Sequence, residues 1–122
     1  MGMWPFSERR RNKRLKVAWE ASLICRGVSG VRTVQVAVDE VSLNGVRLQL
    51  QRMQVGPYHL LVGETPEECE LAIDVPQGLF KSTVRFQWYD QPHSEGFFVV
   101  GAEFVNMEPE SRQTLKLAIR GL

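Results

Sequence analysis

Residues 33–50, TVQVAVDEVSLNGVRLQL, decide the fold of this chain. Valine or leucine occupies every second position from Val34 to Val38 and again from Val46 to Leu50, which is the period of a β-strand with one buried face. Asn44-Gly45 lies between the two runs and is a strong signal for a tight hairpin turn. The stretch therefore predicts two antiparallel strands that meet at this turn.

The same alternation extends outward from this hairpin. It recurs over Leu15–Leu23, Glu70–Val75 and Ser82–Tyr89, and each of these segments is predicted to be a strand. Phe97–Val105 is instead a largely apolar run interrupted by Gly101, which is typical of a strand buried on both sides. On these patterns we expect four aromatic side chains to lie on core faces: Trp19, Phe86, Trp88 and Phe104.

Two further segments have a different character. Residues 54–68 hold glycines and prolines among acidic side chains, which predicts a mixture of short strand and loop. The end of the chain has helical period instead, because an apolar stripe runs from Leu115 to Leu122 after Pro109, a residue suited to the first turn of a helix. We therefore predict a closing helix at about residues 109–120.

Together these elements indicate a mainly β protein. Several antiparallel strands with short turns and one helix are typical of a small β-barrel whose mouth is covered by the helix or by the N-terminal segment. A chain of 122 residues is long enough for one domain and too short for two typical ones. We expect residues 1–14 to form a flexible basic arm and residues 15–122 to form the single barrel domain.

Positive charge is concentrated at the start of the chain, although the whole sequence carries only +1. Of the 15 lysine and arginine side chains, six lie within the first sixteen residues, where Glu8 is the sole acid. Residues 17–122 hold 9 basic and 13 acidic side chains, a net charge of −4. A body of that sign repels a long polyanion, so the distribution favours a small phosphate ligand over a nucleic-acid surface.

Other kinds of chemistry find little support in the sequence. Cys25 and Cys69 have no C-x-x-C spacing, so we expect two reduced thiols and neither a disulfide framework nor a metal site. His59 and His93 are isolated, and without a Gly-rich phosphate loop we expect no enzyme. The sequence shows neither the pattern of a signal peptide nor a span of roughly 20 apolar residues, which predicts a cytoplasmic protein without membrane insertion.

Two motifs carry a family resemblance. Arg10-Arg11-Asn12-Lys13-Arg14 fits the pattern R-x-x-x-R, and about two strands later Glu40–Gly45 nearly fits [D/N]-x-S-x-x-G. In this order, on a barrel-like pattern, they make the chain resemble a PilZ domain over nearly its whole length, including Val100–Phe104 before the helix. Members of that bacterial family are receptors for the second messenger cyclic di-GMP. The resemblance implies a small six-stranded antiparallel PilZ-type β-barrel with a C-terminal α-helix, and a ligand but no cofactor.

The resemblance also assigns roles to residues of the two motifs. Arg10 and Arg14 would clamp phosphates and stack on guanine faces, because a guanidinium group is a planar fork of donors. Ser42 would hydrogen-bond to the ligand, and Gly45 would leave space for a base or let the turn take a positive φ. Three further arginines are weaker candidates for ligand contact: Arg9, Arg11 and Arg47.

Glu40 departs from the family pattern, which has Asp or Asn at that position. A glutamate can still accept hydrogen bonds from guanine N1 and N2, but its extra methylene moves the carboxylate by roughly a bond length. The neighbouring Asp39 is expected to point to the other face of the strand, since side chains alternate, unless a bulge intervenes. The sequence therefore predicts that binding through Glu40 is retained but weakened.

The functional prediction is a non-enzymatic cyclic di-GMP receptor. The basic arm and the E-x-S-x-x-G strand motif would clamp the ligand and change the surface shown to a partner protein. The alternative is a degenerate PilZ-like adaptor that does not bind the nucleotide and acts through protein contacts, a possibility that Glu40 keeps open. A nucleic-acid binder that uses the arm is disfavoured by the acidic body.

Overall fold

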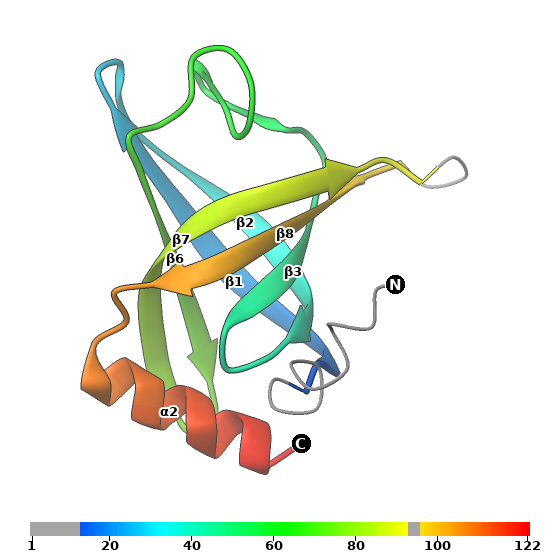
Figure 1. The fold of residues 1–122 in the computed structure, drawn as a ribbon, viewed down its shortest axis with the longest axis vertical. Helices are drawn as coiled ribbons and strands as arrows, with labels where there is room; N and C mark the ends of the chain where they lie inside the picture. The colour runs from blue at the N-terminus through cyan, green and yellow to red at the C-terminus, as the bar shows by residue number, and fades with distance from the viewer. Residues whose placement is uncertain (1–12, 93–95) are drawn as a thin grey trace, which may run out of the picture.

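Figure 1 shows a six-stranded antiparallel barrel with one helix at its end, in a computed structural model that describes residues 13–92 and 96–122. The barrel is closed in the order β1-β2-β3-β8-β7-β6. The predicted fold class is thereby confirmed, and the predicted C-terminal helix is present. The elements are β1 (Leu15–Gly27), β2 (Gly30–Val41), β3 (Gly45–Leu50), β6 (Glu68–Val75), β7 (Gly78–Asp90), β8 (Phe98–Val105) and α2 (Pro109–Arg120).

Two sets of three strands make up the barrel. Short turns join β1 to β2 to β3, while β6, β7 and β8 follow one another in the second set. The sets close on each other along two seams, where β1 pairs with β6 and β3 pairs with β8. Both seams join residues that lie far apart in the sequence, so no short turn holds them together. The barrel therefore depends on the buried side chains that line its inside.

The alternation seen in the sequence is what fills the core. Leu23, Val38, Leu48 and Ile73 are fully buried, and they come from four different strands. Helix α2 adds Leu115 and Ala118, both buried, on the side of the barrel formed by β7. One cluster of apolar side chains therefore runs through the barrel to the helix.

The aromatic side chains divide into two groups. Phe80 is fully buried, and its ring meets those of Trp19 and Phe104 edge-on at centroid distances of 6.2 and 6.4 Å. Trp19, Phe86 and Phe104 pack against the core, as predicted. The prediction that Trp88 lies in the core is wrong, since 43% of its surface is exposed. A register shift between Phe86 and Trp88 in the pairing of β7 with β8 moves the indole to the outside of the barrel.

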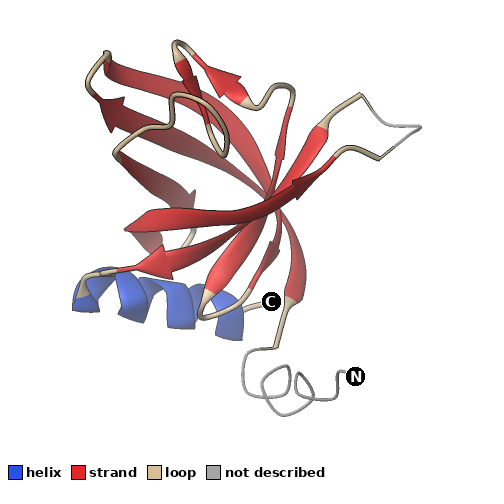
Figure 2. Cartoon of the chain, turned by 45° about the horizontal axis from the view of Figure 1, so that its top comes forward, coloured by secondary structure: helices blue, strands red, loops and turns tan. Residues whose placement is uncertain are grey.

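A small two-stranded sheet, β4 (Gln54–Val55) with β5 (Tyr58–His59), lies at the end of the barrel away from α2 (Figure 2). Tyr58 anchors it, because its fully buried ring directs the hydroxyl to the β1–β2 turn. That hydroxyl donates to the carbonyl of Gly30 at 2.6 Å and accepts from the amide of Ser29 at 3.0 Å. Residues 54–68 are therefore mixed strand and loop, as predicted.

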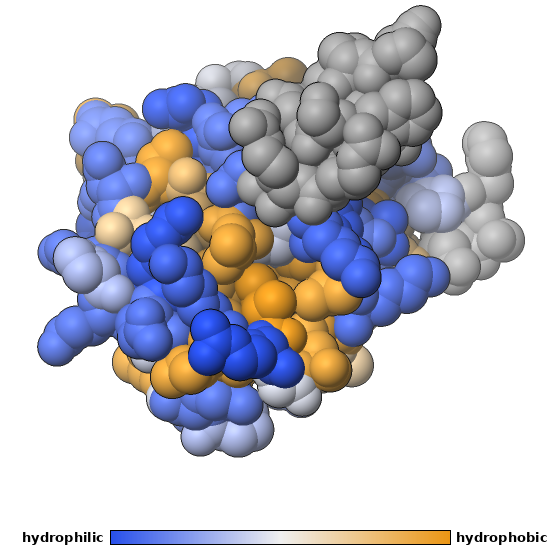
Figure 3. Space-filling view, turned by 60° about the horizontal axis from the view of Figure 1, so that its bottom comes forward, coloured by the Kyte–Doolittle hydropathy of each residue, from blue (hydrophilic) through white to orange (hydrophobic). Residues whose placement is uncertain are grey.

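The opposite end carries the start of β1, the β2–β3 turn and α2 (Figure 1). Figure 3 shows apolar surface exposed between polar side chains when this end is turned toward the viewer. Exposed large apolar residues of α2 and its neighbourhood in the sequence include Leu117 and Leu122. Among the described residues, no helix has both the length and the apolar character needed to cross a membrane.

Candidate functional site

The turn between β2 and β3 is built around Ser42. Its hydroxyl oxygen accepts hydrogen bonds from the amides of Asn44 at 3.1 Å and Gly45 at 3.2 Å, and its own amide donates to the Gly45 carbonyl at 2.9 Å. The side chain is buried. A serine hydroxyl that accepts from the next amides along the chain fixes a turn. Ser42 thus holds in place the segment that follows Glu40.

Gly45 is required for close packing of two strands. A Cβ atom at this position would collide with the carbonyl oxygen of Ala102 and would approach the Cα atom of Glu103 to 3.2 Å. Gly45 lies opposite Glu103 in the pairing of β3 with β8. Its φ is not positive, so of the two roles expected for Gly45 the left-handed turn is wrong, and the close approach of the two backbones by itself requires glycine here.

A β-bulge at Asp39 determines which side chains face outward. In the pairing of β2 with β3, Val38 lies opposite Leu48 and Glu40 lies opposite Arg47, which leaves Asp39 as an extra residue. Val38 and Val41 are both fully buried, so Asp39 and Glu40 between them both point away from the core. The exception foreseen from the sequence therefore applies, and two adjacent carboxylates share one face.

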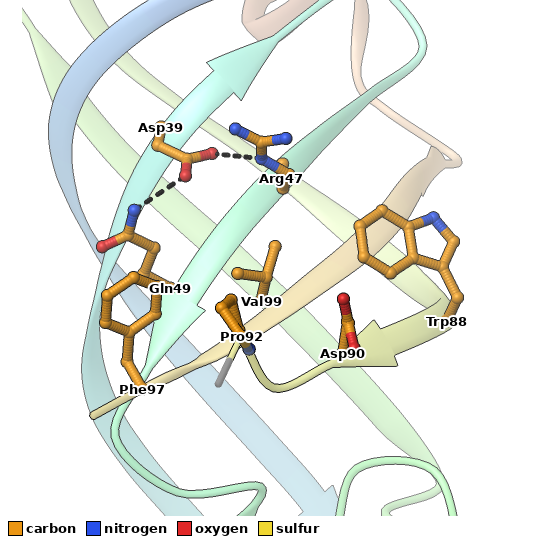
Figure 4. Close-up of a pocket in the computed structure, with 8 residues that line it drawn as sticks. All are labelled: Asp39, Arg47, Gln49, Trp88, Asp90, Pro92, Phe97 and Val99. Carbon is orange, nitrogen blue, oxygen red and sulfur yellow. Dashed lines mark hydrogen bonds and ion pairs between the residues drawn. The ribbon is translucent and has the colours of Figure 1, made fainter. Parts of the chain in front are cut away.

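Asp39 and Arg47 form the best-defined contact of this face. The Nε–H of Arg47 donates to Asp39 Oδ1 at 2.8 Å, and the amide of Gln49 donates to Oδ2 at 2.8 Å (Figure 4). The hydrogen bond to Asp39 raises the pKa of Arg47 above its usual value, so this guanidinium keeps its charge. Both carboxylate oxygens of Asp39 are thereby engaged.

Glu40 lies between two arginines. Its Oε1 is 3.9 Å from Arg14 Nη1 and its Oε2 is 3.7 Å from Arg47 Nη1, which are ion-pair distances and not hydrogen bonds. The side chain of Glu40 is 16% exposed, whereas that of Arg14 is 69% exposed. Lys16 is paired with Glu40 across β1 and β2, so the strand pairing itself brings the end of the basic segment to this motif.

A groove of about 330 Å³ adjoins Arg47 on the outside of the barrel. Arg47 and Gln49 extend into it from β3, Trp88 and Asp90 from β7, and Val99 of β8 lies between them (Figure 4). The indole of Trp88 lies directly on Gly101, where any side chain would collide with the ring. Trp88 therefore covers the outer face of β8 at Gly101. This contact explains why β8 is apolar on its outer face as well as on its inner face.

The structure brings Arg14, Glu40 and Arg47 together and places Ser42 and Gly45 in the turn behind them. Arg9, Arg10 and Arg11 lie outside the described residues, as does His93.

Sequence reasoning missed Asp39, Gln49 and Trp88 as groove residues. The apolar positions Val38 and Val41, three apart instead of two, were the available signal for the bulge. Within residues 13–92 and 96–122, no group of three or more His, Cys, Asp or Glu side chains is placed to hold a metal ion.

No protein-family model and no curated protein matches this sequence. Solved structures do match. The PilZ domain of YcgR from Escherichia coli, with c-di-GMP, is 12% identical with a TM-score of 0.57 over 92% of this chain and 90% of that one. The MrkH–c-di-GMP complex of K. pneumonia is 12% identical with a TM-score of 0.67 over 93% of this chain. MotI/DgrA, an inhibitor of motility from Bacillus subtilis, is 14% identical with a TM-score of 0.65 over 93% of this chain.

These likenesses define the class of fold: the chain is a PilZ-type barrel. It matches most of the PilZ domain of YcgR, 90% of that chain. It spans only about half of the two longer chains, 50% of MotI/DgrA and 51% of MrkH. The fold predicted from the two motifs is therefore confirmed by structural likeness.

Proposed function

We propose that this protein is a non-enzymatic cytoplasmic receptor for cyclic di-GMP, with Arg14, Glu40 and Arg47 as direct ligand contacts. The observation that carries the proposal is the bulge at Asp39, which gathers two carboxylates and two guanidinium groups on one outward face beside the exposed indole of Trp88. A cyclic dinucleotide offers two phosphates and two guanine bases, so it requires cations, hydrogen-bond acceptors and a flat apolar surface. The likeness to PilZ-type structures that hold c-di-GMP supports this ligand.

The two arginines suit the phosphates in different ways. Arg14 is largely exposed and meets Glu40 only at 3.9 Å, so a phosphate can recruit it without breaking a close hydrogen bond. The Nε–H of Arg47 is held by Asp39. This bond fixes the side chain, so the remaining N–H groups of the guanidinium point in a fixed direction. Arg14 therefore acts as the adjustable clamp and Arg47 as the fixed one.

The two carboxylates also divide their roles. Both oxygens of Asp39 accept hydrogen bonds at 2.8 Å, whereas Glu40 makes only the longer ion pairs among the described residues. Glu40 is thus the acceptor left for guanine N1–H and N2–H, and Asp39 is a positioning residue for Arg47 and Gln49. Ser42 and Gly45 support this arrangement by fixing the turn that follows Glu40.

Trp88 completes the proposed site. Its indole is exposed on the outside of the barrel, and one side of the ring lies against Gly101. Indole rings bind nucleobases by stacking, and a base placed on Trp88 in the groove would lie beside Arg47. The contributions of Arg9, Arg10 and Arg11 to phosphate binding remain predictions from the sequence.

Binding at this place would alter one end of the barrel. Arg14 immediately precedes β1, and Lys16 is paired with Glu40, so a ligand held by both motifs ties the start of β1 to the β2–β3 turn. We propose that a partner protein binds this end of the barrel and distinguishes its ligand-free form from its ligand-bound form. Hydrogen exchange should show slower exchange of amides 13–20 with saturating ligand; unchanged exchange there would count against the switch while leaving binding itself intact.

The test of binding is a calorimetric titration with cyclic di-GMP, with GTP as the competing nucleotide. The Arg14→Ala variant should bind about 10–100-fold more weakly, because hydrogen bonds between charged groups contribute about 1.5–3 kcal/mol. Arg112→Ala is the matched control, since it removes the same charge from an exposed position on α2 and should leave affinity unchanged. Absence of binding by the parent protein would exclude the receptor and leave the adaptor.

A further inference from the structure

The two cysteines, 44 residues apart in the sequence, face each other across the β1–β6 seam. Cys25 and Cys69 are directly opposed in the register of the two strands, and their Sγ atoms are 3.6 Å apart. Directly opposed residues of antiparallel strands have Cα atoms about 4.5 or 5.5 Å apart, which lies within the range that a disulfide spans. The backbone is therefore already arranged for a bond between the two sulfurs.

We propose that Cys25 and Cys69 are a redox modification site, at which a peroxide converts the two thiols into an intramolecular disulfide. One thiol loses its proton, and the thiolate attacks one oxygen of the peroxide. The O–O bond breaks, a sulfenic acid forms, and the departing hydroxide takes up the proton and leaves as water. The second thiol loses its proton, and its thiolate attacks the sulfenic sulfur. The S–S bond forms, the S–O bond breaks, and the departing hydroxide takes up that proton and leaves as a second water. Two thiols are oxidised and one hydrogen peroxide is reduced to two waters.

Access to the pair is controlled by the end of the strand ladder. Cys25 and Cys69 are 0% and 5% exposed. The hydrogen bond between them, together with burial, raises the pKa of Cys69, whereas the same hydrogen bond lowers the pKa of Cys25, so Cys69 is the thiol that the closed barrel keeps protonated. However, the next pair, Arg26 with Glu68, is the last in the β1–β6 register. Opening of this terminal pair by local fraying exposes the sulfurs without unfolding the barrel.

The bond would reinforce the seam and leave the proposed ligand site alone. It would tie β1 to β6, and thus the first set of three strands to the second. Glu40 pairs with Lys16 near the other end of β1, nine residues from Cys25, which corresponds to about 30 Å along a strand. This inference therefore does not depend on the proposed function.

The experiment compares the full chain after treatment with hydrogen peroxide and after treatment with a reducing agent. We expect loss of both free thiols, a mass lower by about 2 Da, and a peptide map that links Cys25 to Cys69. The oxidised protein should remain monomeric and melt about 5–15 °C higher, because the cross-link restricts the unfolded chain. Calorimetry with cyclic di-GMP should give the same result in both redox states.

Two single-cysteine variants test whether the disulfide forms between Cys25 and Cys69. Cys25→Ala and Cys69→Ala should each retain one thiol that oxidant cannot link within the chain. The peptide map of the parent protein needs no variant, so a folding defect in either one does not obscure the outcome. Thiols that both stay alkylatable after peroxide treatment, or oxidation that yields only dimers linked between chains, would overturn the proposal.

Discussion

The strand pairings that carry the proposed site and the strand pairings on the other side of the barrel differ in regularity. β1 pairs with β6, and β6 with β7, without any register shift. In contrast, β2 has an extra residue at Asp39 and β7 has one at Gln87, on either side of the regular β3–β8 pair. The groove lies between these two irregularities, with Asp39 on one wall and Trp88 on the other.

This contrast shows how a barrel can present chemistry on its outside without weakening its core. A bulge inserts one residue and turns the side chains beside it, while the buried positions on either side keep their places. Val38 and Val41 stay buried around the first bulge. The regular pairings, β1 with β6 and β6 with β7, supply stability, and the bulged pairings, β2 with β3 and β7 with β8, supply the site, so substitutions in the two regions should have separable effects.

The largest expected effect belongs to the regular β6–β7 pairing, in which Phe80 lies opposite Ile73. Phe80→Ala removes a fully buried ring that contacts Trp19 and Phe104, and it should lower the free energy of unfolding by about 3–5 kcal/mol. Denaturant unfolding would measure the loss. Leu79→Ala is the control, because its side chain is exposed on the same strand and should change stability by less than about 0.5 kcal/mol. Equal losses in the two variants would show that β7 does not divide into an inner and an outer face.

Glu40→Ala should have the next largest effect, on affinity and not on stability. It removes the proposed acceptor for guanine and should weaken cyclic di-GMP binding about 10–100-fold, since a hydrogen bond to a charged group contributes about 1.5–3 kcal/mol. Glu40→Asp keeps a carboxylate and should bind the ligand. Glu20→Ala removes a carboxylate from an exposed position on β1 and serves as the charge-matched control. Calorimetry that found Glu40→Ala equal to the parent would remove Glu40 from the site.

Trp88→Ala tests the second bulge. Loss of the stacking surface should weaken binding by about 1–2 kcal/mol, roughly 5–30-fold, with little loss of stability because the indole is exposed. Tyr89→Ala is a suitable comparison, since this ring is exposed to a similar extent but packs toward Phe98 and His59 and does not line the groove. If both variants bound like the parent, the ligand would not extend into the groove.

The sequence predicted the regular region better than the bulged one. Alternation placed the strands, and Asn44-Gly45 marked the turn, because both signals depend on neighbouring residues only. A bulge adds a single residue and breaks that alternation, so Trp88 was assigned to the core when it lies outside. The approach of Cys25 to Cys69 depends on closure of the barrel between distant strands, and no local pattern reports it.

Gly45 illustrates a different limit. The sequence shows that the motif has glycine at this position. The reason why glycine is needed there, the approach of the Ala102 carbonyl, comes from a strand almost sixty residues away. Similarly, Arg47 was only a weak candidate in the sequence, because its contacts with Asp39 and Glu40 follow from the bulge. The motif located the site, and the partners of each side chain required the fold.

The smallest expected effect concerns two ion pairs of similar length. Arg47 meets Asp39 at 2.8 Å in the groove, and Arg85 meets Glu103 at 2.9 Å on the open surface, where both side chains are more exposed. Gln49 also holds Asp39, so less side-chain entropy is lost when Arg47 binds. Double-mutant cycles with alanine should therefore give a coupling of about 1 kcal/mol for the first pair and about 0.2–0.5 kcal/mol for the second. Equal couplings would mean that the bulge confers no special order on the groove, and the fixed role proposed for Arg47 would then fail.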